Sequence, residues 1–293
     1  MDTHHPGTAL RGVLASIGAS ALFGFIFFIS GAISASATTV FTVRVLVTAA
    51  CYTLVLTLPA ARSSLRQFLR SLTATPWQPL IFVLLTALIA LQLWLFAWTP
   101  VHGHALDASL GYLLLPISLV IIGRFIFRFH VTRMQWMAVL IAVVAVSVKA
   151  ILNAHLSWVT LAICFGYALY FSIRKHFHLD GPMAYGAEVW LLSPFSIWLL
   201  LQFSERLDLS TNALVILAGL SGALAMALYL AASTLLSMPV FGLLSYGEPL
   251  LLFVVALLLG EQLVPSDSVV YGLLAIALII LAVDGFQRSR QAL

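Results

Sequence analysis

Two hydroxyl residues and a proline, Ser109, Tyr112 and Pro116, are spaced along an apolar stretch so that they share one face of a helix. The hydroxyls can donate and accept hydrogen bonds, and a proline inside a helix leaves one backbone carbonyl without its partner. In lipid, that carbonyl must be satisfied by protein or by a watery cavity. We therefore predict that this face points into the protein and can hold the polar groups of a solute.

A second apolar stretch, close to the C-terminal end, repeats this pattern. Aligning its proline, Pro249, with Pro116 places Gly242 and Ser245 at the positions of the earlier serine and tyrosine, and Tyr246 follows directly. The polar stripe is thus repeated together with the proline. We predict that the two stretches line one central site.

Arg44 and Glu188 are charged residues within other apolar stretches. Insertion scales assign about 2.5 to 3.5 kcal/mol to such a residue at the centre of a membrane helix, so each needs an inward-facing partner or cavity. Their depth places Arg44 in the outer half and Glu188 in the inner half, away from the centre, and predicts Asp107 as partner of the first and Arg174 or Lys175 as partner of the second. Two interpretations stay open: structural ion pairs or snorkelling near helix ends, and a role in gating or substrate binding.

Aromatic residues occur at helical spacing in two further stretches. Trp94 and Trp98 lie four residues apart, and Tyr167 and Tyr170 three apart. Aromatic walls suit apolar or cationic ligands through stacking and cation–π contacts. We expect Trp94 and the tyrosines to line the solute path, whereas Trp98 also fits an aromatic belt at the membrane surface.

Glu248, next to Pro249, is the deepest acidic residue of the sequence. A carboxyl group in the membrane interior can load and release a proton during a transport cycle, so Glu248 is a candidate for proton coupling. The alternative is a structural hydrogen bond to a neighbouring helix or to the carbonyl freed by Pro249.

The remaining reactive side chains give no catalytic or metal pattern. His102 with His104, and His176 with His178, have the spacing of some metal sites, but we expect solvated loop histidines because no third ligand is near. The sequence contains no G-x-S-x-G, H-E-x-x-H, P-loop or G-x-G-x-x-G motif. We therefore predict no enzyme activity, no metal and no cofactor.

The composition is that of a polytopic membrane protein. Of 293 residues, 62% are hydrophobic and 8% are charged, whereas soluble domains carry roughly 25% charge. The net charge of +4 does not indicate nucleic-acid binding, because the basic residues stand between apolar stretches, where they set orientation.

Ten apolar runs have a length suited to crossing the bilayer. They cover residues 10–30, 39–58, 80–99, 105–122, 134–148, 156–173, 183–202, 213–233, 239–259 and 269–284, with short turns between them. If both termini are cytoplasmic, the cytoplasmic side holds eleven of the fourteen Lys and Arg residues, as the positive-inside rule requires.

Ten spans divide into two five-helix repeats, residues 10–150 and 156–286, and an odd number of spans inverts the second repeat. Each proline then lies about 15 Å into its span, near the midplane of a core roughly 30 Å thick. The first span also resembles a signal peptide, because Arg11 stands at its start and the small residues 35–37, which follow it, resemble a cleavage site. Since its removal would break the repeat, we expect it to be retained as a helix.

Several short motifs resemble the RarD-type permeases of the drug/metabolite transporter superfamily, which are built from EamA-type repeats. The matching motifs are R-V at Arg44, W-L-F-x-W at Trp94–Trp98, A-S-L-G-Y-x-x-x-P at Ala108–Pro116, M-Q-W at Met134–Trp136, E-x-W-L-L-x-P at Glu188–Pro194 and Y-x-x-P at Tyr246–Pro249. The Gly-Glu pair that closes the fourth span of such proteins is replaced here around Phe127 and Arg128, whereas Gly260-Glu261 keeps it in the second repeat.

The resemblance implies an all-α membrane protein of ten helices in two inverted repeats that exports small metabolites. Amino-acid exporters of the YddG type are among the members of this superfamily. We therefore expect a secondary transporter of the bacterial inner membrane that exports small molecules, foremost amino acids, by alternating access, with protons as a candidate coupling ion and no nucleic-acid partner. Drug-like or nucleotide-linked solutes, or a non-transporting scaffold or receptor, are the alternatives.

Overall fold

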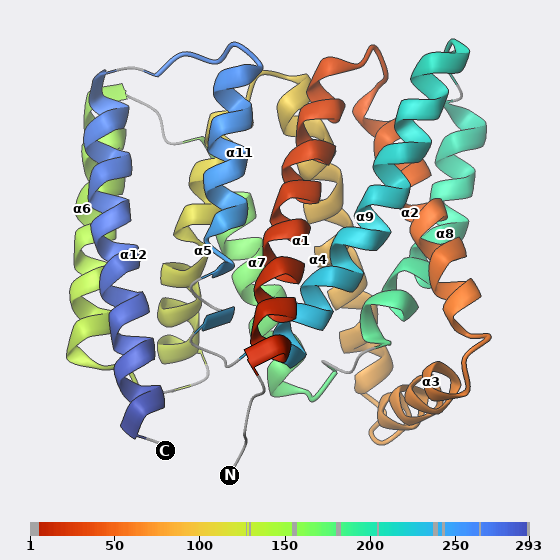
Figure 1. Ribbon diagram of the computed structural model, residues 1–293, viewed down its shortest axis with the longest axis horizontal. Helices are drawn as coiled ribbons and strands as arrows, with labels where there is room; N and C mark the ends of the chain where they lie inside the picture. The colour runs from red at the N-terminus through yellow and green to blue at the C-terminus, as the bar shows by residue number, and fades with distance from the viewer. Residues whose placement is uncertain are drawn as a thin grey trace.

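The computed structural model of the chain describes residues 6–126, 128, 130–153, 157–179, 183–203, 205–236, 240–241, 244–263 and 265–291, and it consists of helices joined by turns (Figure 1). The helices are α1 (Pro6–Ala32), α2 (Ala37–Val55), α3 (Pro59–Leu72), α4 (Gln78–Val101), α5 (Ala105–Phe125), α6 (Arg133–Asn153), α7 (Trp158–His176), α8 (Ala184–Gln202), α9 (Leu209–Leu235), α11 (Gly247–Leu258) and α12 (Pro265–Gln291). No strand occurs in these ranges, which confirms the all-α class.

Seven of the described helices are long and apolar enough to cross a membrane: α1, α2, α4, α5, α8, α9 and α12. The other predicted spans correspond to α6, α7 and α11, which lie among these helices with their axes running the same way (Figure 1). In Figure 1, α1 begins and α12 ends at the same face of the molecule. The chain is therefore a multi-pass membrane protein, while the full count of ten spans stays a prediction.

The segment between α2 and α4, which we expected to be a short connection, contains the helix α3. Pro59 occupies the first turn of α3, where a proline costs no hydrogen bond. Phe68 is buried and packs edge-to-face on Phe82 of α4, with ring centroids 5.5 Å apart. Figure 1 shows α3 lying across the ends of the other helices.

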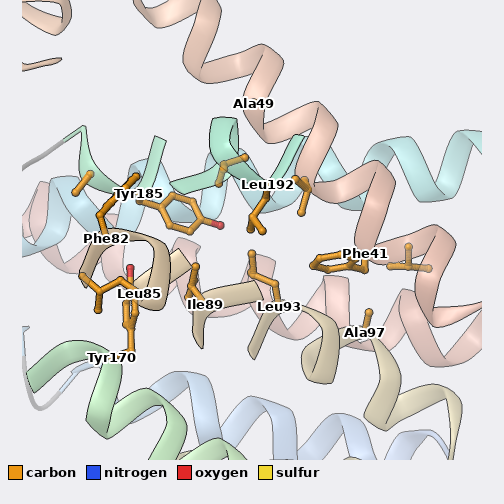
Figure 2. Close-up of a cluster of buried hydrophobic side chains, with 14 of the residues drawn as sticks. Phe41, Ala49, Phe82, Leu85, Ile89, Leu93, Ala97, Tyr170, Tyr185 and Leu192 are labelled. Atoms are coloured by element: carbon orange, nitrogen blue, oxygen red, sulfur yellow. The ribbon is translucent and has the colours of Figure 1, made fainter. Parts of the chain in front are cut away.

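The helices pack as pairs around a shared interior. α1 packs on α9 and α11, α2 on α8 and α9, α5 on α7 and α11, and α6 on α12, while α4 touches α1, α2, α7 and α8. Figure 2 shows one apolar core in which a row of α4 side chains, spaced three or four residues apart, faces α2 and α8. The labelled members of that row are Phe82, Leu85, Ile89, Leu93 and Ala97.

The two prolines that suggested a symmetric site occupy different structural positions. α5 is one continuous helix with Pro116 in its interior, as expected. In the second stretch, Ser245 and Tyr246 form a turn, α11 begins at Gly247, and Pro249 lies in its first turn. Residues 240, 241 and 244 before the turn are helical, so the second stretch is broken as expected, and Pro249 follows the break in a first turn, where a proline lacks only a donor that has no intrahelical acceptor.

α6 and α12 are joined by polar contacts at both ends. Lys149 Nζ lies 2.9 Å from Asp267 Oδ1, and the two residues are only 8% and 3% exposed. At the other end, Thr132 Oγ1 donates to Asp284 Oδ1 at 2.9 Å. These contacts fix how the α6–α12 pair sits at the edge of the bundle.

Lys149→Met is expected to destabilise the protein by about 3 to 5 kcal/mol, because it leaves the Asp267 carboxylate without its ammonium in a low-dielectric setting. The double variant Lys149→Met with Asp267→Leu should recover most of that loss, since replacing both charges by apolar groups removes the desolvation penalty. Thermal unfolding in detergent micelles measures both effects. Equal melting temperatures for wild type and the single variant would contradict the expected role.

Candidate functional site

Side chains from five helices interact electrostatically inside the bundle. Glu248, in the first turn of α11, interacts electrostatically with Arg44 of α2, and its charge also acts on Tyr112 of α5, Tyr167 of α7 and Tyr229 of α9. We call these five residues the central cluster. Since each of the five side chains carries a charged or hydroxyl group and none is exposed, the cluster concentrates polar chemistry within an otherwise apolar bundle.

Glu248 is partly accessible, although its helix packs against both α1 and α5. Its carboxyl group makes neither a hydrogen bond nor an ion pair with the described residues, and Arg44 is the charge that acts on it. The first turn of a helix carries free N–H groups and partial positive charge, which stabilise a carboxylate at this position. An interior carboxyl group without a direct partner is available to a cationic group or a proton.

Arg44 is 5% exposed, and its guanidinium lies over the ring of Phe96, 4.8 Å from the centroid. Nη1 is buried and has no hydrogen-bond partner among the residues that the structure describes. Gly222 of α9 makes room for this side chain, since a Cβ there would lie 3.1 Å from Nε. The predicted pairing of Arg44 with Asp107 is wrong: Asp107 Oδ2 instead lies 2.9 Å from His104 Nδ1, three residues earlier in the chain.

This geometry also corrects the depth that we inferred for Arg44. Counting residues from the helix end placed its Cα in the outer half, but the long side chain reaches the interior, where its charge acts on Glu248, Tyr112, Tyr167 and Tyr185. Position along one helix gives the height of the backbone only. The direction of the side chain depends on the neighbouring helices.

Tyr112 and Tyr167 are brought together by the close approach of α5 and α7. A Cβ at Gly111 would lie 2.9 Å from Ile163 Cβ, so glycine is what allows this spacing. The two tyrosine hydroxyls are 3.5 Å apart and their ring centroids 5.5 Å apart. The edge of Tyr112 also meets Phe96.

The predicted stripe on α5 faces two different neighbours. Ser109 is fully buried and its Oγ donates to Leu106 O at 2.8 Å, with Tyr271 Oη of α12 at 3.2 Å. Its hydrogen-bonding capacity is therefore used outside the central cluster. Pro116 is half-buried, one turn beyond Tyr112.

The turn before α11 contributes less to the centre than expected. Ser245 Oγ donates to Phe241 O at 2.8 Å, and Ser245 also interacts with the Tyr229 hydroxyl. Tyr246 packs against the core formed by α5, α6 and α12. Gly242, the remaining residue of this predicted stripe, lies outside the described residues.

Glu188 forms the ion pair that the sequence predicted. Its Oε2 accepts a hydrogen bond from Tyr170 Oη at 2.7 Å and lies 3.8 Å from Arg174 Nη1, and Arg174 also donates to the Tyr170 hydroxyl. Glu188 is 0% exposed, and its Oε1 has no hydrogen-bond partner in the described part of the chain. This network engages Tyr170 and ties α7 to α8.

Trp94 and Trp98 stack on each other with centroids 5.7 Å apart. Trp98 also stacks on His102 and His104 in the loop after α4, at 4.3 and 5.4 Å. Trp98 therefore lies next to the loop, and Trp94 lies one turn farther into the bundle. Within the described ranges, no three His, Cys, Asp or Glu residues are grouped as metal ligands.

Glu261 is a residue whose contact the sequence alone did not predict. Gly260, at φ 91°, closes α11 with a Schellman turn in which Glu261 N donates to Ala256 O. This turn aims the carboxylate at the start of α5, where its two oxygens accept from Ala105 N at 2.6 Å and Leu106 N at 2.7 Å. The Gly260-Glu261 pair was the sequence feature that could have indicated this contact. In the structure, Glu261 caps the N-terminus of α5 and thereby links α11 to α5.

Glu261→Ala is expected to lower the stability by about 2 kcal/mol, because it removes two charge-assisted hydrogen bonds at a helix N-terminus. Its exposed neighbour Gln262 provides the control, and Gln262→Ala should change the stability by less than about 0.5 kcal/mol. Thermal unfolding of the purified variants measures the difference. Identical unfolding of both variants would show that the cap contributes nothing.

Comparison with known proteins finds relatives along almost the whole chain. An uncharacterized transporter of Pasteurella multocida is 32% identical over 287 residues, covering 96% of this chain and 99% of the relative. An uncharacterized transporter of Haemophilus influenzae is 34% identical, with 96% of each chain covered. The chloramphenicol-sensitive protein RarD of Pseudomonas aeruginosa is 34% identical, with 75% of this chain and 76% of the relative covered. No family model and no solved structure matches the chain.

Proposed function

Because this chain belongs to the RarD-type family of membrane transporters, we propose that it exports small amphipathic solutes, foremost amino acids, across the bacterial inner membrane. The observation that carries the substrate class is the central cluster, in which the buried cation of Arg44 and the interior carboxyl group of Glu248 interact electrostatically without a direct ion pair between them. Transport, not catalysis, is the activity proposed for these residues.

The charges of the central cluster suit a zwitterion. A buried charge without a compensating partner costs several kcal/mol, so Arg44 and Glu248 are held apart at an energetic cost that a bound ligand would reduce. The carboxylate of an amino acid would accept from Arg44 Nη1, and its ammonium group would donate to Glu248. The rings of Tyr112 and Tyr167 would contact the ammonium or an apolar side chain.

The transport cycle that we propose is alternating access between two inverted repeats, residues 10–150 and 156–286. A two-fold axis between such repeats makes equivalent helices neighbours, and the packing of α2 on α8, α5 on α11 and α6 on α12 supports this arrangement. The beginning of α1 and the end of α12 at one face, together with the basic residues expected there, support cytoplasmic termini. The short helix α11, which starts within the bundle, supports an ion-binding helix end near the centre.

A counterflow assay tests the proposal. Purified protein is reconstituted into liposomes that are loaded with one unlabelled amino acid from a panel, and the entry of labelled solute is followed with and without a pH gradient. Saturable exchange of at least one amino acid is the expected result. Exchange of none of them, by protein that remains folded, would refute the substrate class.

Drug-like solutes are the second candidate, and the observation that favours them is the stacked pair of Trp94 and Trp98, which Trp158 contacts at a tilt. A wall of this kind binds flat apolar compounds by stacking. One relative is named a chloramphenicol-sensitive protein, so chloramphenicol belongs in the same panel. Exchange of such compounds without exchange of amino acids would support this candidate.

A further inference from the structure

Helix α3 separates its side chains into an apolar arc and a basic face. Phe68 and Leu72 belong to the core against α4, and Leu65 is half-buried beside them. Leu69 is 48% exposed at the border of this arc. The apolar arc is thus larger than the surface that the protein itself covers.

Arg62, Arg66 and Arg70 follow one another at four-residue spacing, so they form a row along the exposed face of α3. Arg62 donates to Leu56 O at 2.6 Å, which anchors it to the end of α2. In the described part of the chain, no ion pair involves these three arginines. The sequence has no Asp or Glu from residue 3 to residue 106, so the row has no acidic neighbour within its own segment.

The position of α3 is that of a helix at a membrane surface. It connects the end of α2 to the start of α4, both of which are long and apolar enough to span the bilayer. Large apolar side chains near it stay exposed, with Leu58 at 57%, Trp77 at 70% and Leu80 at 63%. Tryptophan is typical of the level at which lipid headgroups begin.

We propose that α3 is a binding site for anionic phospholipids, in which Arg66 and Arg70 contact headgroup phosphates and Leu69 enters the adjoining acyl region. An arginine fork matches the geometry of phosphate oxygens, and a guanidinium that is already at the surface reaches them at little conformational cost. Basic residues next to a membrane span attract anionic lipids, and the attraction weakens with added salt. This site is independent of the solute that the protein carries.

The test uses the full-length protein and native mass spectrometry of the lipids that remain bound. Wild-type protein is equilibrated with equal amounts of phosphatidylglycerol and phosphatidylcholine, and so is the variant Arg66→Gln with Arg70→Gln. Arg62 is left in place because it anchors the helix. The control is Arg128→Gln with Arg133→Gln, which removes two exposed arginines elsewhere.

We expect wild type and control to favour phosphatidylglycerol, and the α3 variant to lose at least about five-fold of that preference, since each basic residue at a membrane surface contributes about a five-fold effect. The charge-conserving variant Arg66→Lys with Arg70→Lys should retain most of it, and unchanged thermal unfolding establishes that all variants fold. An unaltered lipid preference in the glutamine variant would overturn the proposal. Equal displacement of the lipid by soluble glycerol phosphate would also overturn it, because the site would then recognise a free phosphate.

Discussion

Glu248→Gln is expected to reduce the affinity for an amino-acid substrate about 10- to 100-fold, because a hydrogen bond to a charged group contributes roughly 1.5 to 3 kcal/mol. The carboxyl group lies inside the bundle, is partly accessible and has no direct partner among the described residues, so its negative charge is available to a substrate ammonium. Glutamine keeps the size of the side chain and one acceptor oxygen while it removes the charge. Counterflow in liposomes, with affinity taken from the concentration dependence, measures the effect.

Glu205→Gln is the matched control, since Glu205 is exposed and its carboxylate accepts a hydrogen bond from Ser36 N at the start of α2. The same assay separates the two roles that Glu248 could have. If the carboxyl group binds substrate, exchange weakens at every pH. If it carries the coupling proton instead, exchange persists in the variant and only the response to a pH gradient disappears. Wild-type exchange with an intact gradient response would contradict both roles.

Arg44→Ala is expected to lower exchange by a similar factor while the protein reaches the membrane in normal amounts. The guanidinium lies over Phe96, and its Nη1 has no hydrogen-bond partner within the described ranges, so it offers a donor to a substrate carboxylate. Arg44→Lys should retain part of the activity, because the charge remains but the planar fork is lost. Initial rates of exchange, normalised to protein in the membrane, give the comparison.

Arg206→Ala controls for the loss of an arginine, since Arg206 is exposed in the segment before α9. Unchanged transport in Arg44→Ala would show that this residue is a structural charge, which was the alternative that the sequence left open. Loss of protein from the membrane would instead indicate a folding role. The melting temperature of the purified variant distinguishes that outcome from a loss of binding.

Interactions between residues close in depth were predictable from the sequence. Glu188 and Arg174 lie on consecutive helices, near the ends that a short connection joins. Their similar depth in the membrane was therefore sufficient to predict the ion pair. Pro116 was expected inside a helix and is found there. In both cases, the period of the helix and the membrane thickness limit the possible neighbours.

The partner of Arg44 could not be predicted from depth. Asp107 has a suitable depth, but it is satisfied by His104 within its own chain segment, and the Arg44 side chain passes Gly222 toward the interior. Which neighbour a long side chain meets depends on how five helices pack, and spacing along one helix does not specify that.

The break near Pro249 was predictable from the sequence, but its exact position was not. The sequence does not distinguish a proline inside a helix, such as Pro116, from one in the first turn after a break, and the turn at Ser245 makes Pro249 the second kind. The segment of α3 is too polar to register as a span, so its four-residue arginine spacing went unrecognised as helical.

Calorimetric binding to purified protein in nanodiscs tests whether one site holds both ends of a zwitterion. Three ligands are compared: a transported amino acid, its amide, which lacks the carboxylate, and its deaminated acid, which lacks the ammonium. Wild type should bind the amino acid most tightly. Arg44→Ala should weaken binding of the amino acid but not of the amide, and Glu248→Gln should weaken binding of the amino acid but not of the deaminated acid. Equal affinity of wild type for all three ligands, or equal losses for every ligand in both variants, would show that Arg44 and Glu248 do not bind the two ends of the substrate.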